Sequence, residues 1–361
     1  MNGVRMKAVG GFAFSILAVV LSASCGEKPK VAEAPAKPVG PPLAIETPLG
    51  LPPVPIPADN PPTADTVALG RRLYYDTQLS ADNTVACSNC HNPTLAFTDG
   101  RPVSLGVNGK TGTRNAPTVL NAAYHPVQFW DGRAKSLEDQ AGGPIQNPLE
   151  MNQSHDVMVA KISKLTDYQA AFDKAFGPGP ITVDKVEKAI ASFERTVISG
   201  NSPFDRYEYG GDKKAMSAAA IRGLALFRDK TKGNCVTCHT MEDKYALFTD
   251  GKFHNIGVGI DPNGELTDQG RYEQTKLDAD RGAFRTPTLR NIAKTAPYMH
   301  DGSEKTLKDV VDFYVGGGTS NPHLDKEIKE LKLKGPERAD LVAFLEALTG
   351  DVPANTGPPG Q

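Results

Sequence analysis

The chain has 361 residues, a length typical of two domains, and 39% hydrophobic residues, enough to form buried cores. Its formal net charge is −2 at pH 7, which excludes the basic surface that nucleic-acid binding requires. With 35 glycines and 29 prolines, the composition indicates long ordered loops rather than dense regular structure.

The first 25 residues have the pattern of an export signal, in which Arg5 and Lys7 precede an apolar stretch at 10–21. That stretch is too short for a typical membrane-spanning helix. Small residues then lead to Cys25, which leaves two endings open: lipid attachment to Cys25, as in a bacterial lipoprotein, or ordinary cleavage. We expect a periplasmic protein, with contact to a membrane only through a lipid on Cys25.

Both ends of the chain are predicted to lie outside the domains. Residues 26–63 are rich in proline and alanine, which predicts an extended linker between an anchor and a globular body. Residues 351–361 are predicted to form a flexible tail.

The other four cysteines form two pairs, in CSNCH (87–91) and CVTCH (235–239). The spacing Cys-x-x-Cys-His is that of c-type haem attachment, where both thiols bond to the macrocycle and the histidine binds the iron. A redox dithiol or a zinc site is the alternative, but a histidine follows both pairs and the chain carries an export signal. The motifs predict two covalent haems with His91 and His239 as iron ligands. The attachment residues are Cys87, Cys90, Cys235 and Cys238.

The sequence around these motifs repeats. The stretches ALGRRLYYD (68–76) and IRGLALFRD (221–229) precede the motifs, and their apolar residues recur at helical spacing. Further on, APTVLN (116–121) matches TPTLRN (286–291) at an offset of 170 residues. The two motifs themselves are 148 residues apart, so the second copy carries about 22 additional residues.

The repeat predicts a mainly α fold with two cytochrome-c-like haem domains, residues 64–200 and 201–350, and long ordered loops. Between them, residues 182–197 predict a helix that starts after an N-cap at Thr182 and packs across the domain junction. Its expected apolar face consists of Val186, Ile190, Phe193 and Val197.

The ligand opposite each histidine decides what each haem does, because an iron with an open side can bind and activate a small oxidant. Each copy predicts a short helix after an Asp-Gly pair. In the second copy this helix carries Tyr314, whose phenolate can bind ferric iron; the first copy has Pro144 there, with Gln140 one turn before it. This predicts one open and one capped haem. Met299 and His300 remain alternative ligands.

The remaining histidines are not expected to bind iron. We interpret His125 as a polar residue behind the haem ligands. The other three, expected at the surface or in loops, are His155, His254 and His323.

Two long stretches carry a family resemblance. CSNCH…RNAPTVLNAAYHPVQFWDGRAKSLEDQAGGPIQNPLEM and CVTCH…DRGAFRTPTLRNIAKTAPYMHDG resemble the bacterial dihaem cytochrome c peroxidases and their relative MauG, over about residues 64–350. The resemblance implies that Trp130 lies between the haems and couples them. It also implies a peroxide pocket with Gln140, Pro144 and Glu150, in which the glutamate is the acid/base. A calcium site between the haems is implied for Asn115, Thr295 and Pro297.

At two positions the sequence departs from the well-studied peroxidases. Some of them carry a histidine in the loop after the first motif, which blocks the peroxide site until the other haem is reduced; Val107 stands at that place here. Peroxidases usually cap the second haem with methionine, whereas Tyr314 stands there, as in MauG. Tyrosine ligation is therefore the favoured reading.

The predicted function is that of a dihaem cytochrome c peroxidase, an enzyme that reduces hydrogen peroxide with electrons from a small c-type cytochrome or a cupredoxin. The alternative is a MauG-like oxidase that modifies a protein partner, which Val107 and Tyr314 favour. A pure electron carrier is a third class, against which Gln140 and Glu150 argue.

Overall fold

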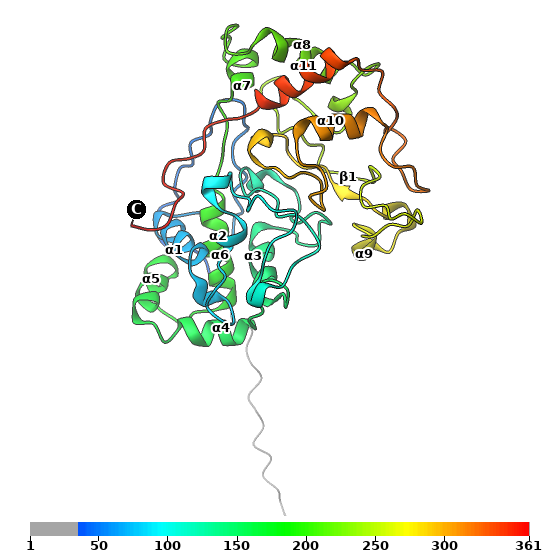
Figure 1. Cartoon of the computed structure of the whole chain (residues 1–361). Coiled ribbons are helices and arrows are strands. Elements are labelled where there is room, and N and C mark those ends of the chain that lie inside the picture. The colour runs from blue at the N-terminus through cyan, green and yellow to red at the C-terminus, as the bar shows by residue number, and fades with distance from the viewer. Residues whose placement is uncertain (1–34, 361) are drawn as a thin grey trace, which may run out of the picture. The chain divides into compact units, whose positions relative to one another are not determined.

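Helices dominate the structure, a computed structural model that describes residues 35–360 (Figure 1). The prediction of a mainly α fold is confirmed. Within the described residues there is one sheet, an antiparallel pair of β1 (Phe253–His254) and β2 (Phe284–Arg285). The helices are α1 (Ala64–Tyr74), α2 (Cys87–Cys90), α3 (Leu137–Gln146), α4 (His155–Ile162), α5 (Thr166–Phe176), α6 (Val183–Glu194), α7 (Pro203–Glu208), α8 (Ala218–Arg228), α9 (Tyr272–Thr275), α10 (Leu307–Val315) and α11 (Gly335–Glu346).

The helices predicted ahead of the two Cys-x-x-Cys-His motifs are confirmed as α1 and α8. Each begins at a hydroxyl residue, Thr63 or Ser217, whose side chain accepts a hydrogen bond from a backbone N–H of the first turn. Such caps satisfy donors that a helix start leaves without a partner. The two helices therefore start where their sequences place a capping residue.

Both helices cross a partner helix at a glycine. A Cβ on Gly70 of α1 would lie 1.8 Å from the carbonyl oxygen of Ala189 in α6. A Cβ on Gly223 of α8 would lie 2.0 Å from the carbonyl oxygen of Asp340 in α11. Any larger residue would push the helices apart, so both crossings depend on glycine.

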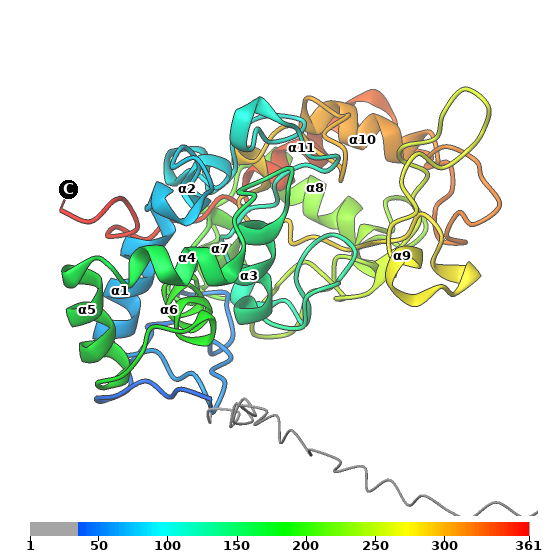
Figure 2. The ribbon, with the colours of Figure 1, turned by 90° about the horizontal axis from the view of Figure 1, so that it is seen from below.

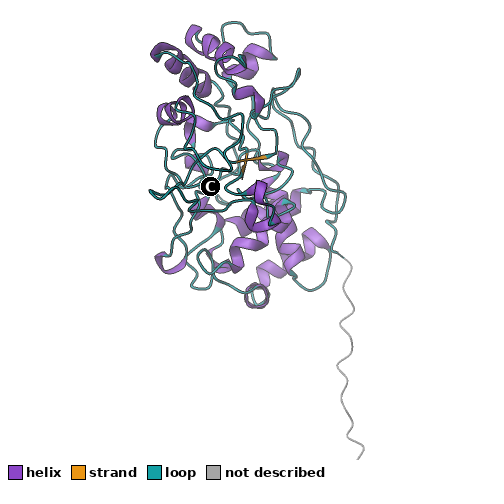
Figure 3. Ribbon diagram, turned by 90° about the vertical axis from the view of Figure 1, so that its right-hand side faces the viewer, coloured by secondary structure: helices purple, strands orange, loops and turns teal. Residues whose placement is uncertain are grey.

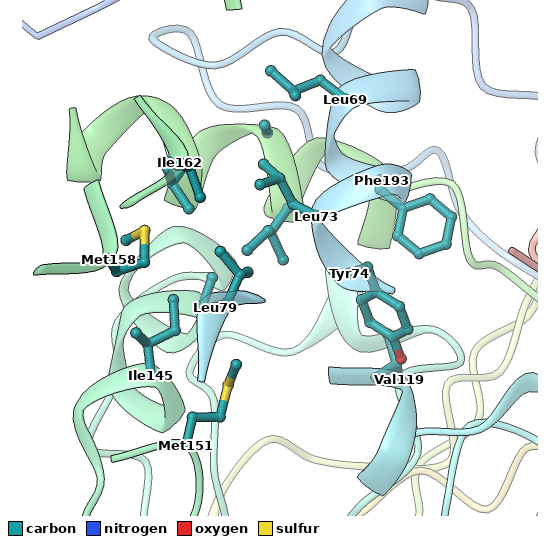
Figure 4. Close-up of a cluster of buried hydrophobic side chains, with 14 of the residues drawn as sticks. Leu69, Leu73, Tyr74, Leu79, Val119, Ile145, Met151, Met158, Ile162 and Phe193 are labelled. Carbon is teal, nitrogen blue, oxygen red and sulfur yellow. The ribbon is translucent and has the colours of Figure 1, made fainter. Parts of the chain in front are cut away.

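Each of these two helix pairs belongs to its own hydrophobic cluster. The first combines α1, α3, α4, α5 and α6, and its centre includes Leu73 and Phe193 (Figure 4). The second combines α8, α10 and α11 around Phe227 and Phe344. Figure 2 shows the two groups of helices on opposite sides, and Figure 3 shows loops and the short sheet between them. The clusters belong to one compact unit, so the domain boundary after residue 200 stays a prediction.

The helix predicted between the halves is confirmed as α6, but its expected packing was wrong. Thr182 caps it, and its four expected apolar residues are at most 1% exposed. These residues face α1 and α3 within the first cluster instead of crossing the junction. The reason is geometric, since Gly70 brings α1 so close to α6 that its apolar face is already covered.

The segment expected to be a free linker is attached to the body over residues 35–63. The backbone N–H of Val39 donates to a carbonyl of α5 at 2.9 Å, and the fully buried Asn60 side chain donates to a carbonyl of α6 at 3.0 Å. The carbonyl of Gly50 accepts a hydrogen bond from the side chain of Arg290 in the second half. The segment is extended, as predicted, but it is not free. Its hydrogen bonds to both halves give partners to buried polar groups, such as the side chain of Arg290, that would otherwise have fewer.

The tail is also attached rather than free. The hydroxyl of Tyr75 donates to the carbonyl of Thr356 at 2.6 Å, and Arg71 donates to the carbonyls of Gly357 and Pro358. Thr356 is 6% exposed. The C-terminal segment therefore returns from the second half to the end of α1 (Figure 1).

The predicted export signal lies in residues 1–25, outside the described residues, and so does Cys25. Among residues 35–360, no helix is long and apolar enough to cross a membrane.

Candidate active site

The first Cys-x-x-Cys-His motif forms the short helix α2 and places His91 directly after it. The backbone N–H of His91 donates to the carbonyl of Cys87 at 3.0 Å. Its Nδ1 lies 3.3 Å from the carbonyl oxygen of Phe97. A carbonyl can only accept, so Nδ1 carries the proton and Nε2 keeps its lone pair for a metal.

The second motif repeats this geometry with a 3₁₀ turn at Cys235–Thr237. The Nδ1 of His239 donates to the carbonyl of Phe248 at 2.9 Å, which again leaves Nε2 free to bind a metal. Burial lowers the pKa of both His91 and His239, so the neutral imidazoles that bind iron are the favoured forms.

None of the four motif cysteines forms a disulfide within residues 35–360. Burial raises the pKa of Cys90 and Cys238 to about 11 and that of Cys235 to about 12. Within residues 35–360 no group of three or more histidine, cysteine, aspartate or glutamate residues could hold a metal ion, so the zinc alternative finds no support. Paired thiols beside a histidine with a free Nε2 fit c-type haem.

Glu150 lies close to the first motif. It is partly buried, and burial raises its pKa, although nearby Arg133 and a hydrogen bond from Asn147 at 2.5 Å act in the opposite direction. Burial is the largest cause of the raised pKa of the Cys87 and Cys90 thiols, and the charge of Glu150 is one of the smaller causes. The structure therefore brings this carboxyl group into the surroundings of the first haem attachment.

Gln140 and Pro144 lie one turn apart on α3, so they share a helix face. Pro144 is inside the helix, and its carbonyl accepts a hydrogen bond from the backbone N–H of Met151 at 3.2 Å. This bond folds the chain back after α3 and brings the residue before Met151, Glu150, toward the end of the helix. The two side chains are partly buried.

The loop that carries Val107 is fixed to the same region. Val107 is 1% exposed and belongs to the first hydrophobic cluster, and its backbone N–H donates to the carbonyl of Glu150 at 2.8 Å. A Cβ on the preceding Gly106 would lie 2.0 Å from the carbonyl oxygen of Leu149. The loop is therefore packed against the segment that contains Glu150, and the Val107 side chain belongs to the first hydrophobic cluster.

Trp130 lies in the wall of a cavity that also contains the second motif. Its indole Nε1 donates to the carbonyl of Asn115 at 2.9 Å, and its own carbonyl accepts from the backbone N–H of Arg285 at 2.8 Å. The cavity wall includes Cys235, Cys238 and His239 together with Trp130. The only tryptophan of the chain is thus placed between a segment of the first half and the second motif.

The three residues expected to bind calcium, Asn115, Thr295 and Pro297, also line this cavity. The Asn115 amide nitrogen donates to the carbonyl of Arg101 at 2.8 Å, which leaves its side-chain oxygen free. Amide, hydroxyl and carbonyl oxygens are ligands that calcium accepts. The calcium site stays a prediction with a compatible set of oxygens.

Tyr314 and Met299 both line the cavity beside His239. Burial raises the pKa of Tyr314, and its hydroxyl makes no hydrogen bond to any residue between 35 and 360. His300 is 4% exposed, and its ring stacks on Phe284 with 3.6 Å between the ring centroids. Tyr314, Met299 and His300 therefore all remain candidate ligands in this cavity wall, with the His300 ring stacked on Phe284.

Two charged residues of the cavity wall were not predicted from the sequence. Arg285 is 3% exposed, and no sequence motif marks it. His254, expected at the surface, is partly buried between Asp325 and Asp250, at 2.6 Å and 3.1 Å from its ring nitrogens. Burial opposes protonation of His254, but these two hydrogen bonds raise its pKa.

Comparisons with known proteins agree with this arrangement. The profile described as "Di-haem cytochrome c peroxidase" matches residues 64–214. The chain is 42% identical to the methylamine utilization protein MauG of Methylorubrum extorquens over 84% of each chain. It is 37% identical to the cytochrome c551 peroxidase of Nitrosomonas europaea, over 83% of this chain and 84% of the relative. A crystal structure of a MauG-like protein associated with microbial copper homeostasis has a TM-score of 0.76 and 35% identity, and covers 86% of this chain and 96% of that one.

Two Cys-x-x-Cys-His sites on a mainly helical fold define a dihaem c-type redox enzyme. The similarity to relatives over most of the chain then identifies the family: the protein belongs to the dihaem cytochrome c peroxidase and MauG family. The family implies two haems c, and its matching members include proteins named as peroxidases and proteins named as MauG.

Proposed function

We propose that the protein is an exported dihaem peroxidase that reduces hydrogen peroxide to water with electrons from a small c-type cytochrome or a cupredoxin. The observation that carries this proposal is Glu150, a partly buried carboxyl group with a raised pKa whose charge also acts on the thiols of Cys87 and Cys90. A carboxyl group with a pKa closer to neutral can accept and return a proton at working pH. An electron carrier would have no use for such a group.

The reaction consumes two electrons and two protons for each peroxide and releases two waters. When bound at Cys87 and Cys90, the haem supplies the iron that receives peroxide and passes electrons to it. Glu150 takes a proton from one peroxide oxygen and delivers it to the other, which leaves as water. The Gln140 amide donates a hydrogen bond to the leaving oxygen, and Pro144 leaves the space open because its side chain has no donor atom.

For the second haem we infer that Tyr314 is the second iron ligand, with Met299 as the alternative. The support is the Tyr314 hydroxyl, which faces the cavity of His239 without a hydrogen bond to the described residues. Four other buried or partly buried tyrosines, Tyr74, Tyr75, Tyr124 and Tyr168, do donate such a bond, whereas Tyr298 in the same cavity wall also has none within residues 35–360. Trp130 then passes electrons from the second haem toward the first.

A MauG-like oxidation of a protein partner is the second candidate function. Tyr314 and the buried Val107 favour it, because both depart from the well-studied peroxidases in the direction of MauG. The chain has one tryptophan, Trp130, which the proposal already uses between the haems. An oxidising route to a protein partner would therefore need tyrosines, which keeps the peroxidase function ahead.

We further propose a calcium ion between the halves, held by Asn115, Thr295 and Pro297 and by water. Calcium prefers six to eight oxygens, so water must complete a set with three protein residues. Its expected role is structural, since it would join a loop of the first half to one of the second.

An internal repeat is supported by matched backbone conformations. Asn121 and Asn291 both have positive φ, 64° and 59°, and Gly132 and Gly302 both have φ of 68°. Both pairs are 170 residues apart. The same offset relates Pro144 to Tyr314, which is why one haem is proposed to be open and the other capped. Export to the periplasm, with or without a lipid on Cys25, is proposed from the sequence of residues 1–25.

The test is rapid mixing of the purified dihaem protein with hydrogen peroxide and a reduced c-type cytochrome. We expect immediate oxidation of the cytochrome, with no lag that pre-reduction removes, because Val107 replaces the blocking histidine. If peroxide is consumed while no donor is oxidised, and a protein partner becomes cross-linked or hydroxylated instead, the MauG-like function is the correct one.

A further inference from the structure

Arg285 is a buried cation at the point where the two halves meet. It is the second residue of β2, and its side chain is 3% exposed. Its backbone N–H holds the carbonyl of Trp130, and its side chain lines the cavity of the second motif. Its position is therefore fixed relative to both Trp130 and the proposed second haem.

The guanidinium of Arg285 lacks an anionic partner. An arginine carries five N–H donors, but Arg285 makes two long hydrogen bonds, to the carbonyls of Phe129 at 3.4 Å and Thr286 at 3.5 Å. None of the ion pairs between residues 35 and 360 includes it. Burial alone lowers its pKa to about 10, so no carboxylate of the described chain lies close enough to oppose that effect.

Arg290, five residues further on, shows how this protein satisfies a buried arginine. It is 1% exposed, and its guanidinium donates to both carboxylate oxygens of Asp205 at 2.9 and 3.0 Å. It also donates to the carbonyls of Ala246 and Gly50. A buried charge without such partners is strongly unfavourable, so Arg285 differs from Arg290 in a way that calls for a ligand.

His125 provides a second unsatisfied group in the same cavity. Its Nδ1 is buried and has no hydrogen-bond partner among the described residues. Burial and the charge of Arg285 together lower its pKa well below the usual value, so the imidazole is neutral. A neutral imidazole can donate one hydrogen bond, and the buried Nδ1 of His125 can be that donor.

The cavity wall offers little negative charge of its own. Glu327 is the one carboxylate of this wall, and it accepts a hydrogen bond from Asn234 at 3.4 Å. The same wall contains Cys235 and Cys238, which would hold a haem by its two vinyl-derived positions. A haem also carries two propionate carboxylates, and a planar carboxylate matches the donor geometry of a guanidinium.

We propose that Arg285 and His125 form an anion-binding site whose occupant is a propionate carboxylate of the haem attached at Cys235 and Cys238. The proposal rests on haem attachment and not on peroxidase activity. The side chain of Arg285 would then bind a haem carboxylate while its backbone N–H donates to the carbonyl of Trp130. Its positive charge would favour the reduced state of the second iron and raise the potential of that haem.

The test is spectroelectrochemical titration of the purified dihaem protein with Arg285→Gln. We expect a lower midpoint potential for the second haem and an unchanged potential for the first, with two haems per chain. Arg285→Lys, which keeps the charge, should retain most of the wild-type potential. His125→Phe should lower the potential in the same direction by less, because a lost hydrogen bond leaves more negative charge on the carboxylate.

Arg281→Gln is the matched control, since Arg281 is a cation of the second half that pairs with Asp278 and Gln269 outside the cavity. Equal potentials in Arg285→Gln and Arg281→Gln would overturn the proposal. If Arg285→Gln gives no folded dihaem protein, an unchanged potential in His125→Phe overturns it. The alternative occupant is a free anion from solution instead of a haem propionate. In that case, added phosphate at constant ionic strength would shift the wild-type potential and leave that of Arg285→Gln unchanged, and the proposal would be overturned.

Discussion

Around the first Cys-x-x-Cys-His motif, the structure places the carboxyl group of Glu150, whose pKa is raised by burial; around the second, it places the phenol of Tyr314, whose hydroxyl has no hydrogen bond within residues 35–360. The histidines themselves are held alike, because the Nδ1 of His91 and that of His239 both donate to a backbone carbonyl. The helices that follow the two Asp-Gly pairs differ in sequence, and among these differences α3 has Pro144 where α10 has Tyr314. Two sites with the same histidine geometry can therefore support different chemistry through a few side chains on the covering segments.

The largest expected effect is on peroxide turnover, when the carboxyl group of Glu150 near the first motif is removed. In Glu150→Gln the group keeps its shape but cannot move a proton, so we expect peroxide turnover to fall by about 10²–10⁴-fold. Steady-state oxidation of a reduced cytochrome measures this, while the haem content and spectra should stay normal. Glu187→Gln is the matched control, because Glu187 on α6 is another partly buried carboxyl group whose pKa burial raises, to about 7.

The pH profile of the wild type sharpens the same prediction. Glu150 must start without its proton, and burial raises its pKa, so activity should decrease as the pH falls through that raised pKa. Glu150→Gln should lose this acid limb, and Glu187→Gln should keep it. An unchanged acid limb in Glu150→Gln would mean that another group carries the proton.

The next effect tests whether the two halves are independent. Phe193→Ala in the first cluster and Phe344→Ala in the second each remove a fully buried ring, which should destabilise the protein by about 3–5 kcal/mol. Because residues 35–63 bind both halves, we expect a single calorimetric unfolding transition that both variants shift to lower temperature. Two separate transitions, each moved by one variant only, would show that the halves unfold independently.

The third effect compares the two candidate ligands of the second iron. We expect Tyr314→Phe to remove the low-spin signal of the second haem and Met299→Leu to leave it, because a phenol oxygen is what the first substitution deletes. Electron paramagnetic resonance of the resting ferric protein measures this. The reverse result would assign Met299 as the ligand and reduce Tyr314 to a packing residue.

The smallest effect concerns the connection between the sites. Trp130→Phe keeps an aromatic ring but loses the indole N–H bond to Asn115, so we expect electron transfer between the haems to slow by about tenfold, or ~1.4 kcal/mol in barrier. Reduction of the second haem followed by rapid mixing with peroxide measures the rate. Peroxide binding at the first site is the internal control, and a wild-type transfer rate would remove Trp130 from the path.

The sequence predicts the helices and the attachment motifs well because both depend on local patterns. The helical spacing of apolar residues at 68–76 and 221–229 predicts α1 and α8, and the fixed Cys-x-x-Cys-His spacing predicts haem attachment. Arg285 could not be predicted in this way, because its burial depends on β1 and on the loop of Trp130, which are distant in sequence. The attached position of residues 35–63 was missed for a similar reason, since proline-rich composition describes an extended backbone and not what its carbonyls bind.

The hydrogen bond from Arg290 to Gly50 joins residues 240 positions apart. Contacts of such long separation form late in folding, because the entropy of closing the loop must be overcome before the contact stabilises anything. A Cβ on Gly50 would lie 1.9 Å from the carboxylate of Asp205, so this segment packs directly on the Asp205–Arg290 pair. The first described segment of the chain is therefore expected to reach its final position last, which leaves both Cys-x-x-Cys-His motifs accessible for haem attachment while the rest of the protein assembles.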